Sequence, residues 1–433
     1  MYRKVMERLI EWKNAKDRKP LILRGARQVG KTYIIKEFAE KYYDGLAYFN
    51  FDHDTELYNL FENTKDPTRI LEQLAFIYGK AITPGKTLIV FDEIQECPNA
   101  LNSLKYFNEE ASEYHIISAG SLLGIRLSHT SFPVGKVDFL DMYPMTFTEF
   151  LEADGCKNLV DYMDSMKRIE NIPSIFFDRL SEKLKAYFII GGMPEAVNSW
   201  VQEKDMEKVN KIQQNILNAY ESDFSKHTTD AEANKISIIW NSIPSQISKE
   251  NKKFLYQAAK PGARAREYEG ALNWLKDANV VNKIYNVTKP SMPLIAYRDL
   301  SSFKIYVDDV GLLRKMTDLD SKVVVDGNRL FEEFKGALTE NYVLQTLISI
   351  GLKPYYYTFD NKYEIDFLIQ YKNDIIPIEV KSSENINNIS LKAYNEKYNP
   401  KTRIRFSMRN LSKDGNLINI PLFMVEYLNK FDL

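Results

Sequence analysis

The stretch from Leu21 to Tyr42, LILRGARQVGKTYIIKEFAEKY, decides the fold of the first part of this chain. It begins with three apolar residues typical of a buried strand, and after Thr32 its apolar residues recur at helical spacing. Between them lies GARQVGKT, in which Gly25 and Gly30 are five residues apart and Lys31 and Thr32 follow. A strand, a glycine-rich turn and a helix in this order predict a parallel α/β sheet with a phosphate-binding loop.

This loop has the residue types that a triphosphate requires. Glycines let backbone N–H groups curl around phosphate oxygens, and the helix behind them presents its positive end. Lys31 is expected on the β- and γ-phosphates, and the Thr32 hydroxyl on Mg²⁺. The predicted cofactor-binding residues are Gly25, Ala26, Arg27, Gln28, Val29, Gly30, Lys31, Thr32 and Tyr33.

The run TLIVFDE supplies the second half of the site. Its four apolar residues end in Asp92 and Glu93, and the carboxyl end of a parallel strand faces the ligand crevice of such sheets. We expect Asp92 to bind Mg²⁺ and Glu93 to deprotonate the attacking water, which favours hydrolysis over transfer to a second substrate. A third strand, HIISAGS, ends in Ser118 and Ser121; Ser121 is either a sensor of the γ-phosphate or a plain turn residue.

The identity of the nucleotide base is inferred from the absence of a guanine-recognition motif. The guanine-reading motif N-K-x-D does not occur, and its nearest match, at Asn361, lies in the wrong part of the chain. ATP is therefore the expected nucleotide, with Mg²⁺.

Composition indicates a globular protein, with 44% hydrophobic and 27% charged residues among 433. Two cysteines, Cys97 and Cys156, have no second Cys or His at ligand spacing, which favours a reducing, cytoplasmic location over a disulfide or zinc framework. No apolar run approaches the roughly 18 residues of a membrane span. A net charge of −1 means that only a local basic cluster could attract nucleic acid.

The middle of the chain is predicted to be helical from about Asn158 to Thr228, with a break at Gly191–Pro194. From Asn234 to Lys289 there are 10 lysines and arginines against 4 acids, and a helical pattern passes into a strand-like one. This is typical of a winged helix that binds DNA, and equally of a solvated helical domain that packs against the ATPase.

Near the C-terminus, EIDFLIQYKNDIIPIEVKS predicts a β-hairpin. Alternation places Glu379 beside Lys381, and antiparallel pairing brings Asp366 to the same end. Glu340 lies on the same helical face as leucines that are expected in the core, where a carboxylate is unusual unless it has a functional role. These residues form either a site for Mg²⁺-assisted phosphodiester cleavage, with Glu340, Asp366 and Glu379 holding the ion, or a Glu–Lys pair on a solvated face.

Ordered motifs across the whole chain resemble one family of prokaryotic AAA-superfamily ATPases that carry a C-terminal domain of unknown function. The motifs are GARQVGKT, TLIVFDE, AGSLLG, PVGKVDFLDMYPMTFTEFL, GGMPEAV, FKIYVDDVGLL, KGALTENYV, EIDFLI and PIEVKS. The resemblance implies an ATP-binding αβα core, a winged-helix segment and a terminal domain similar to the PD-(D/E)xK nuclease fold. It assigns Gly30, Lys31, Thr32, Asp92 and Glu93 to the nucleotide, and Glu340, Asp366, Glu379 and Lys381 to the nuclease-like site.

These patterns predict an α/β chain in four parts. They are a P-loop ATPase domain at residues 1–155, a helical lid or linker at 156–232, a winged-helix-like segment at 233–300 and a nuclease-like domain at 301–433. One hypothesis is an ATPase coupled to a nucleic-acid-binding or nuclease-like module, with DNA as partner. The other is an ATP-dependent signalling switch whose C-terminal domain is a non-catalytic scaffold for a protein partner or a second copy of the chain.

Overall fold

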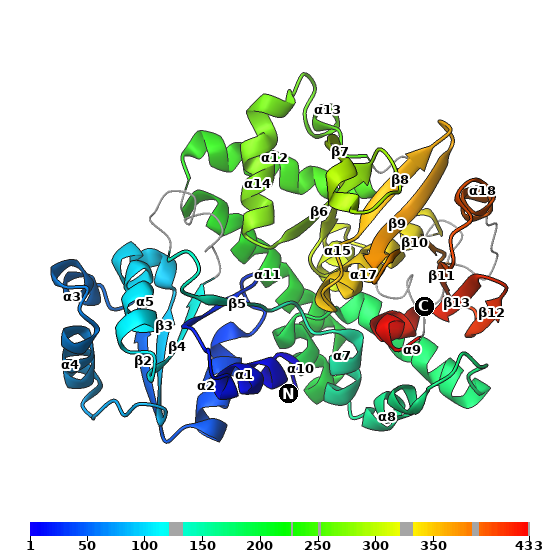
Figure 1. The fold of residues 1–433 in the computed structure, drawn as a ribbon. Helices are drawn as coiled ribbons and strands as arrows, with labels where there is room; N and C mark the ends of the chain where they lie inside the picture. The colour runs from blue at the N-terminus through cyan, green and yellow to red at the C-terminus, as the bar shows by residue number, and fades with distance from the viewer. Residues whose placement is uncertain (121–132, 227, 250–252, 321–331, 383–388, 432–433) are drawn as a thin grey trace. The chain divides into compact units, whose positions relative to one another are not determined.

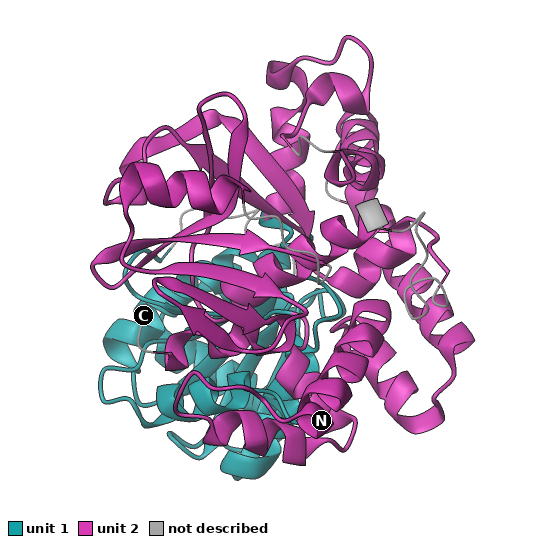
Figure 2. Cartoon of the chain, turned by 90° about the vertical axis from the view of Figure 1, so that its right-hand side faces the viewer, with its two compact units in different colours: residues 1–143, 277–280 teal, residues 144–276, 281–433 magenta. Residues whose placement is uncertain are grey.

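A computed structural model describes residues 1–120, 133–226, 228–249, 253–320, 332–382 and 389–431 (Figure 1). The chain divides into two compact units, residues 1–143 with 277–280, and residues 144–276 with 281–433 (Figure 2). Cys97 and Cys156 are both free thiols. Within the described ranges, no helix has the length and apolarity needed to cross a membrane.

The first unit is built on a five-stranded parallel sheet in the order β2-β3-β4-β1-β5. This confirms the predicted parallel α/β sheet, and it places the carboxyl ends of β1, β3 and β4 along one edge. The strands are β1 Leu21–Arg24, β2 Gly45–Asn50, β3 Thr87–Asp92, β4 His115–Gly120 and β5 Asp138–Asp141. The helices are α1 Val5–Asn14, α2 Lys31–Tyr42, α3 Leu57–Asn63, α4 Pro67–Tyr78, the short η1 Ile94–Glu96, and α5 Pro98–Glu110.

Alternating side chains of these strands pack on opposite faces of the sheet. Phe49, Ile89 and Phe91 join a core with residues of α3, α4 and α5. Helix α2 is amphipathic and buries Ile34 and Phe38 on the other face. The sheet is therefore covered by helices on both sides, as the αβα prediction requires.

The second unit begins with helices, in line with the predicted helical middle. Pro194 at the first position of α10 and the glycines before it end α9, because proline favours a helix start and Gly191 has a φ of 73°. The helices are α7 Phe147–Ala153, α8 Lys157–Ser165, α9 Ser174–Ile190, α10 Pro194–Glu203, α11 Met206–Lys226, α12 Asp230–Ile247, α13 Tyr256–Ala259, α14 Ala265–Asp277 and α15 Val310–Met316.

An eight-stranded mixed sheet forms the rest of this unit, in the order β12-β13-β11-β10-β9-β8-β6-β7. The antiparallel pair after α14, β6 and β7, is joined to β8 at Asn286 and Tyr356, so it is also the edge of the C-terminal sheet. The strands are β6 Val281–Val287, β7 Arg298–Val307, β8 Tyr355–Phe359, β9 Tyr363–Tyr371, β10 Asp374–Val380, β11 Arg403–Ser407, β12 Ser412–Asp414 and β13 Leu417–Pro421. The accompanying helices are η2 Leu294–Tyr297, α17 Glu332–Ser349, α18 Ile389–Tyr398 and η4 Leu422–Lys430.

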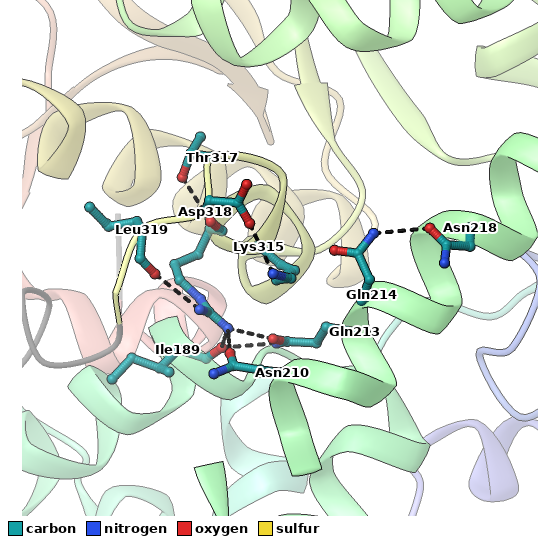
Figure 3. Close-up of polar contacts among 10 residues, drawn as sticks. Ile189, Asn210, Gln213, Gln214, Asn218, Lys315, Thr317, Asp318 and Leu319 are labelled. Atoms are coloured by element: carbon teal, nitrogen blue, oxygen red, sulfur yellow. Dashed lines mark hydrogen bonds and ion pairs between the residues drawn. The ribbon is translucent and has the colours of Figure 1, made fainter. Parts of the chain in front are cut away.

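A buried arginine, Arg314, ties α15 to α9 and α11. Its Nη2 donates to Oε1 of Gln213 at 2.5 Å and to Oδ1 of Asn210 at 2.7 Å, and its Nη1 donates to the carbonyl of Leu319 at 3.1 Å (Figure 3). The carbonyl of Ile189, in the last turn of α9, accepts from Nη2 at 3.4 Å. Burial lowers the Arg314 pKa to about 10, while the Asp320 and Asp318 carboxylates act to raise it. The guanidinium therefore stays charged at neutral pH, and the negative end of α9 lies beside it.

Candidate nucleotide site and C-terminal acidic cluster

The loop between β1 and α2 is shaped by residues with positive φ. Gly25, Gln28 and Gly30 have φ values of 152°, 65° and 92°. A Cβ on Gly25 would lie 2.1 Å from the carbonyl oxygen of Met142, so only glycine fits there. Helix α2 begins at Lys31 with no side-chain cap from Gly30, which leaves the amides of its first turn to bind an anion.

Lys31 is folded against this loop. Its Nζ donates to the carbonyls of Gly25 at 2.9 Å and Ala26 at 2.8 Å, and the residue is 8% exposed. Burial lowers the Lys31 pKa to about 8, while the nearby Glu93 and Asp92 carboxylates act to raise it. A phosphate would supply the negative charge that this buried cation lacks.

Asp92, at the end of β3, faces Thr32. The Thr32 hydroxyl donates to Oδ2 of Asp92 at 3.0 Å, and the backbone N–H of Glu93 donates to Oδ1 at 3.1 Å. A hydroxyl and a carboxylate this close, beside a phosphate-binding loop, are oxygen ligands that suit Mg²⁺. The two residues predicted to bind the metal are therefore brought together.

Sequence reasoning missed Tyr48. Its hydroxyl donates a short hydrogen bond to the same Asp92 oxygen, and burial, with that hydrogen bond, raises the Tyr48 pKa above its ordinary value. Tyr48 lies on β2, where Asn50 pairs in register with Asp92. Only the pairing of β2 with β3 creates this contact, so no local motif signals it.

Glu93 follows β3 with a left-handed backbone, at φ 51° and ψ 42°. Its Oε2 accepts a hydrogen bond of 2.6 Å from Nε2 of Gln95, a second residue that the motif did not indicate. Ser118 is fully buried in β4. Ser121, predicted as a phosphate sensor, lies outside the described residues.

The predicted C-terminal hairpin is present as β9 and β10, which pair antiparallel. Asp366 accepts a hydrogen bond of 2.8 Å from the N–H of Val380, and Oε1 of Glu379 forms an ion pair of 2.7 Å with Lys381. Glu340, on α17, accepts a hydrogen bond of 3.1 Å from the Tyr306 hydroxyl.

The charged groups of this cluster differ in exposure, because Glu340 and Glu379 are buried whereas Asp366 and Lys381 are partly exposed. Glu379 is 4% exposed, and its Oε2 has no hydrogen-bond partner among the described residues. Burial would lower the Lys381 pKa, but Glu379, Asp366 and Glu340 raise it above its ordinary value. The Glu379–Lys381 pair that one alternative predicted is therefore present, with a buried glutamate and a partly exposed lysine.

A second lysine, Lys304 on β7, was also missed. It is wholly buried and forms an ion pair of 2.5 Å with Oε1 of Glu364. Burial would lower its pKa, but Glu364, Glu340 and Asp366 raise it well above the ordinary value. In the part of the chain that the structure describes, no three His, Cys, Asp or Glu side chains are arranged to share one metal ion.

Three family models match separate parts of the chain. An AAA domain model matches residues 17–151. Two domains of unknown function, DUF8612 and DUF4143, match residues 181–323 and 335–423. No curated protein matches the chain.

Several solved structures are similar to this chain at low identity. A Walker-type ATPase of Pyrococcus abyssi has 14% identity and a TM-score of 0.47, covering 73% of this chain and 95% of its own. The RuvB Holliday junction branch migration motor of Thermotoga maritima has 14% identity and a TM-score of 0.31, covering 65% and 89%. The ORC1 protein of Aeropyrum pernix, solved in complex with DNA, has 12% identity and a TM-score of 0.27, covering 73% and 91%. At these TM-scores the likenesses are remote.

The family match, the parallel sheet and the loop geometry agree for the first part of the chain. Residues 17–151 match an AAA domain model and contain a parallel sheet with a phosphate-binding loop.

Proposed function

We propose that this chain binds ATP with Mg²⁺ and hydrolyses it. The observation that carries the proposal is the 3.0 Å hydrogen bond between Thr32 and Asp92, which joins the start of α2 to the end of β3 beside the phosphate-binding loop. The pair gives a magnesium ion two oxygen ligands next to the amides that would hold the phosphates.

Each predicted residue has a role in this proposal. The loop amides and Lys31 bind the phosphates, and Thr32 and Asp92 hold the metal, which would supply charge stabilisation for the transferring phosphoryl group. Glu93 accepts a proton from the attacking water. Ser121 remains a proposed phosphate sensor.

Phosphate release tests this function. The wild-type chain with ATP and Mg²⁺ should turn over, and Glu93→Gln should bind ATP but release little phosphate because it removes the base. Glu110→Gln, at the exposed end of α5, is the matched control and should behave as wild type. Equal turnover by Glu93→Gln and wild type would reassign the base.

We further propose that the second unit contacts nucleic acid, and that its acidic cluster cleaves phosphodiesters with a divalent ion. The support is Oε2 of Glu379, which is buried and has no hydrogen-bond partner among the described residues, while Oε1 of the same carboxylate pairs with Lys381. A cation at Oε2 would offset the cost of burying that oxygen. In the described part of the chain, Asp366, Glu379 and Glu340 are not arranged to share an ion, so the proposal requires these side chains to move together when the ion and DNA bind. Lys381 would then bind the phosphate or the attacking water. The predicted boundaries of the winged-helix-like and nuclease-like parts, 233–300 and 301–433, belong to this proposal.

Incubation with plasmid or single-stranded DNA and Mg²⁺ or Mn²⁺ tests the cleavage. Wild type should cut, while Asp366→Asn and Lys381→Met should not, and Lys372→Met, at the exposed hairpin turn, should cut as wild type does. Cutting that survives both variants would exclude this site. The scaffold hypothesis would be favoured by two results together. The wild-type chain would not cut DNA, and its oligomeric state would change with nucleotide in the same way in Asp366→Asn.

A further inference from the structure

The hydrogen bond between Gln95 and Glu93 is built into the turn that follows β3. The two residues flank Ile94 at the start of η1, and backbone bonds of 3.0 Å from Glu96 N to Glu93 O and from Cys97 N to Ile94 O close the turn. Ile94 is fully buried, and Gln95 is 4% exposed. The Gln95 amide is therefore held by packing, and it presents Nε2 to Oε2 of Glu93 at 2.6 Å.

Glu93 needs a partner such as Gln95 because Lys31 lies nearby and could pair with its carboxylate instead. Its carboxylate lies close enough to Lys31 to act on the pKa of that lysine. If the two paired directly, the Glu93 carboxylate would be held by the lysine and turned toward the phosphate-binding residue. Instead Lys31 is bound by the carbonyls of Gly25 and Ala26, and Glu93 is bound by a neutral amide.

The chemistry of the partner also suits a base. A neutral amide donor orients a carboxylate without placing a second positive charge beside it. Nucleophiles and bases in enzymes are commonly oriented by a third group in this way. With Oε2 bound to Gln95, Oε1 is the oxygen that can face a water molecule.

We propose that Gln95 is the positioning residue for Glu93 in ATP hydrolysis. In this step a water O–H bond breaks and its proton passes to Oε1 of Glu93, while the water oxygen bonds to the γ-phosphorus and the bond from that phosphorus to the ADP oxygen breaks. Gln95 touches neither water nor phosphate; it fixes the direction of the base. The inference rests on the proposed ATPase function and deepens it.

Two substitutions of Gln95 separate positioning from a merely structural role. Gln95→Leu has a similar size but cannot donate, so kcat should fall about tenfold or more while the Kd for ATP stays within about twofold. Gln95→Glu is nearly isosteric and can donate only when protonated. Its two facing carboxylates should share one proton as the pH falls, which restores the donor. Gln73→Leu, on the exposed side of α4, is the matched control and should keep wild-type kcat.

The measurements are phosphate release from about pH 6 to about pH 9 and ATP binding by fluorescence titration, on the full chain. The ratio of Gln95→Glu to wild-type kcat should rise as the pH falls. A kcat for Gln95→Leu within about twofold of wild type, or a ratio that does not change with pH, would overturn the proposal. If Gln95→Leu does not fold, the pH-dependent ratio of Gln95→Glu decides alone.

Failure of the underlying function would look different. If wild type releases no phosphate, or Glu93→Gln releases as much as wild type, the base assignment falls and the role of Gln95 falls with it. If wild type turns over and Glu93→Gln does not, the function stands, and the Gln95 variants test only the positioning.

Discussion

The Thr32 hydroxyl donates a hydrogen bond of 3.0 Å to Oδ2 of Asp92, although 59 residues separate the two in sequence. The contact exists because β1 and β3 both flank β4 in a parallel sheet, so their carboxyl ends meet at one edge. It places the two metal-binding candidates at the start of α2 and at the end of β3.

Replacement of Lys31 by alanine should weaken ATP binding by at least about 100-fold, because a buried cation beside the phosphates supplies a charge-assisted hydrogen bond that water cannot replace. Titration with a fluorescent ATP analogue measures the change. Lys86→Ala is the control. Lys86 belongs to a second Gly-Lys-Thr sequence, at residues 85–87, but it is exposed and precedes a strand, β3, and not a helix. Unchanged affinity in Lys31→Ala would remove this lysine from the site.

ATP binding should take up protons above about pH 8, because burial lowers the Lys31 pKa to about 8 and bound phosphates favour its charged form. Calorimetry at about pH 8.5 in buffers of different ionisation enthalpy should give different binding enthalpies. Identical enthalpies would contradict the assignment.

Lys31 also makes the free energy of unfolding depend on pH, with the opposite sign to a lysine whose pKa is raised by an ion pair. Its folded-state pKa of about 8 lies below the ordinary value of 10.5. Between these values the unfolded chain binds more protons, so the contribution of Lys31 to the unfolding free energy rises with pH across this window.

Removal of the Tyr48 hydroxyl should raise the Mg²⁺ concentration for half-maximal ATP turnover by about tenfold, because a hydrogen bond that orients the Asp92 carboxylate is lost. Turnover of Tyr48→Phe across a magnesium titration measures this. Tyr106→Phe on α5 serves as the matched control. A magnesium requirement equal to that of wild type would show that Asp92 is held without Tyr48.

Alanine substitution at two glycines of the second unit should change the free energy of unfolding in opposite directions. A Cβ on Gly192 would lie 2.1 Å from the carbonyl oxygen of Met145, so Gly192→Ala should lower the unfolding free energy by about 2 kcal/mol or more. Gly270 lies inside α14 with nothing near its Cβ position, and Gly270→Ala should add about 0.5–1 kcal/mol. Urea unfolding followed by circular dichroism measures both, and equal effects would contradict this packing.

Patterns within short stretches of sequence predicted the elements that depend on neighbouring residues alone. The phosphate-binding loop, the acidic end of β3 and the β9–β10 hairpin follow from short-range spacing, and the structure contains each of them. The stripe that Glu340 shares with Leu344 and Leu347 also predicted the buried carboxylate correctly.

The residues that sequence reasoning missed depend on long-range pairing or on the shape of one turn. Tyr48 meets Asp92 only through the register of β2 on β3, and Lys304 meets Glu364 across 60 residues. Gln95 is close to Glu93 in sequence, but the two meet in a turn where Glu93 has a left-handed backbone, which no pattern of hydrophobic residues encodes.

Equilibrium titration of the folded chain with radiolabelled ATP and Mg²⁺ tests the central claim most directly. We predict saturable binding of one ATP per chain, which Lys31→Ala weakens by at least about 100-fold and Lys86→Ala leaves unchanged. A well-folded wild-type chain that shows no saturable uptake of ATP would contradict the account.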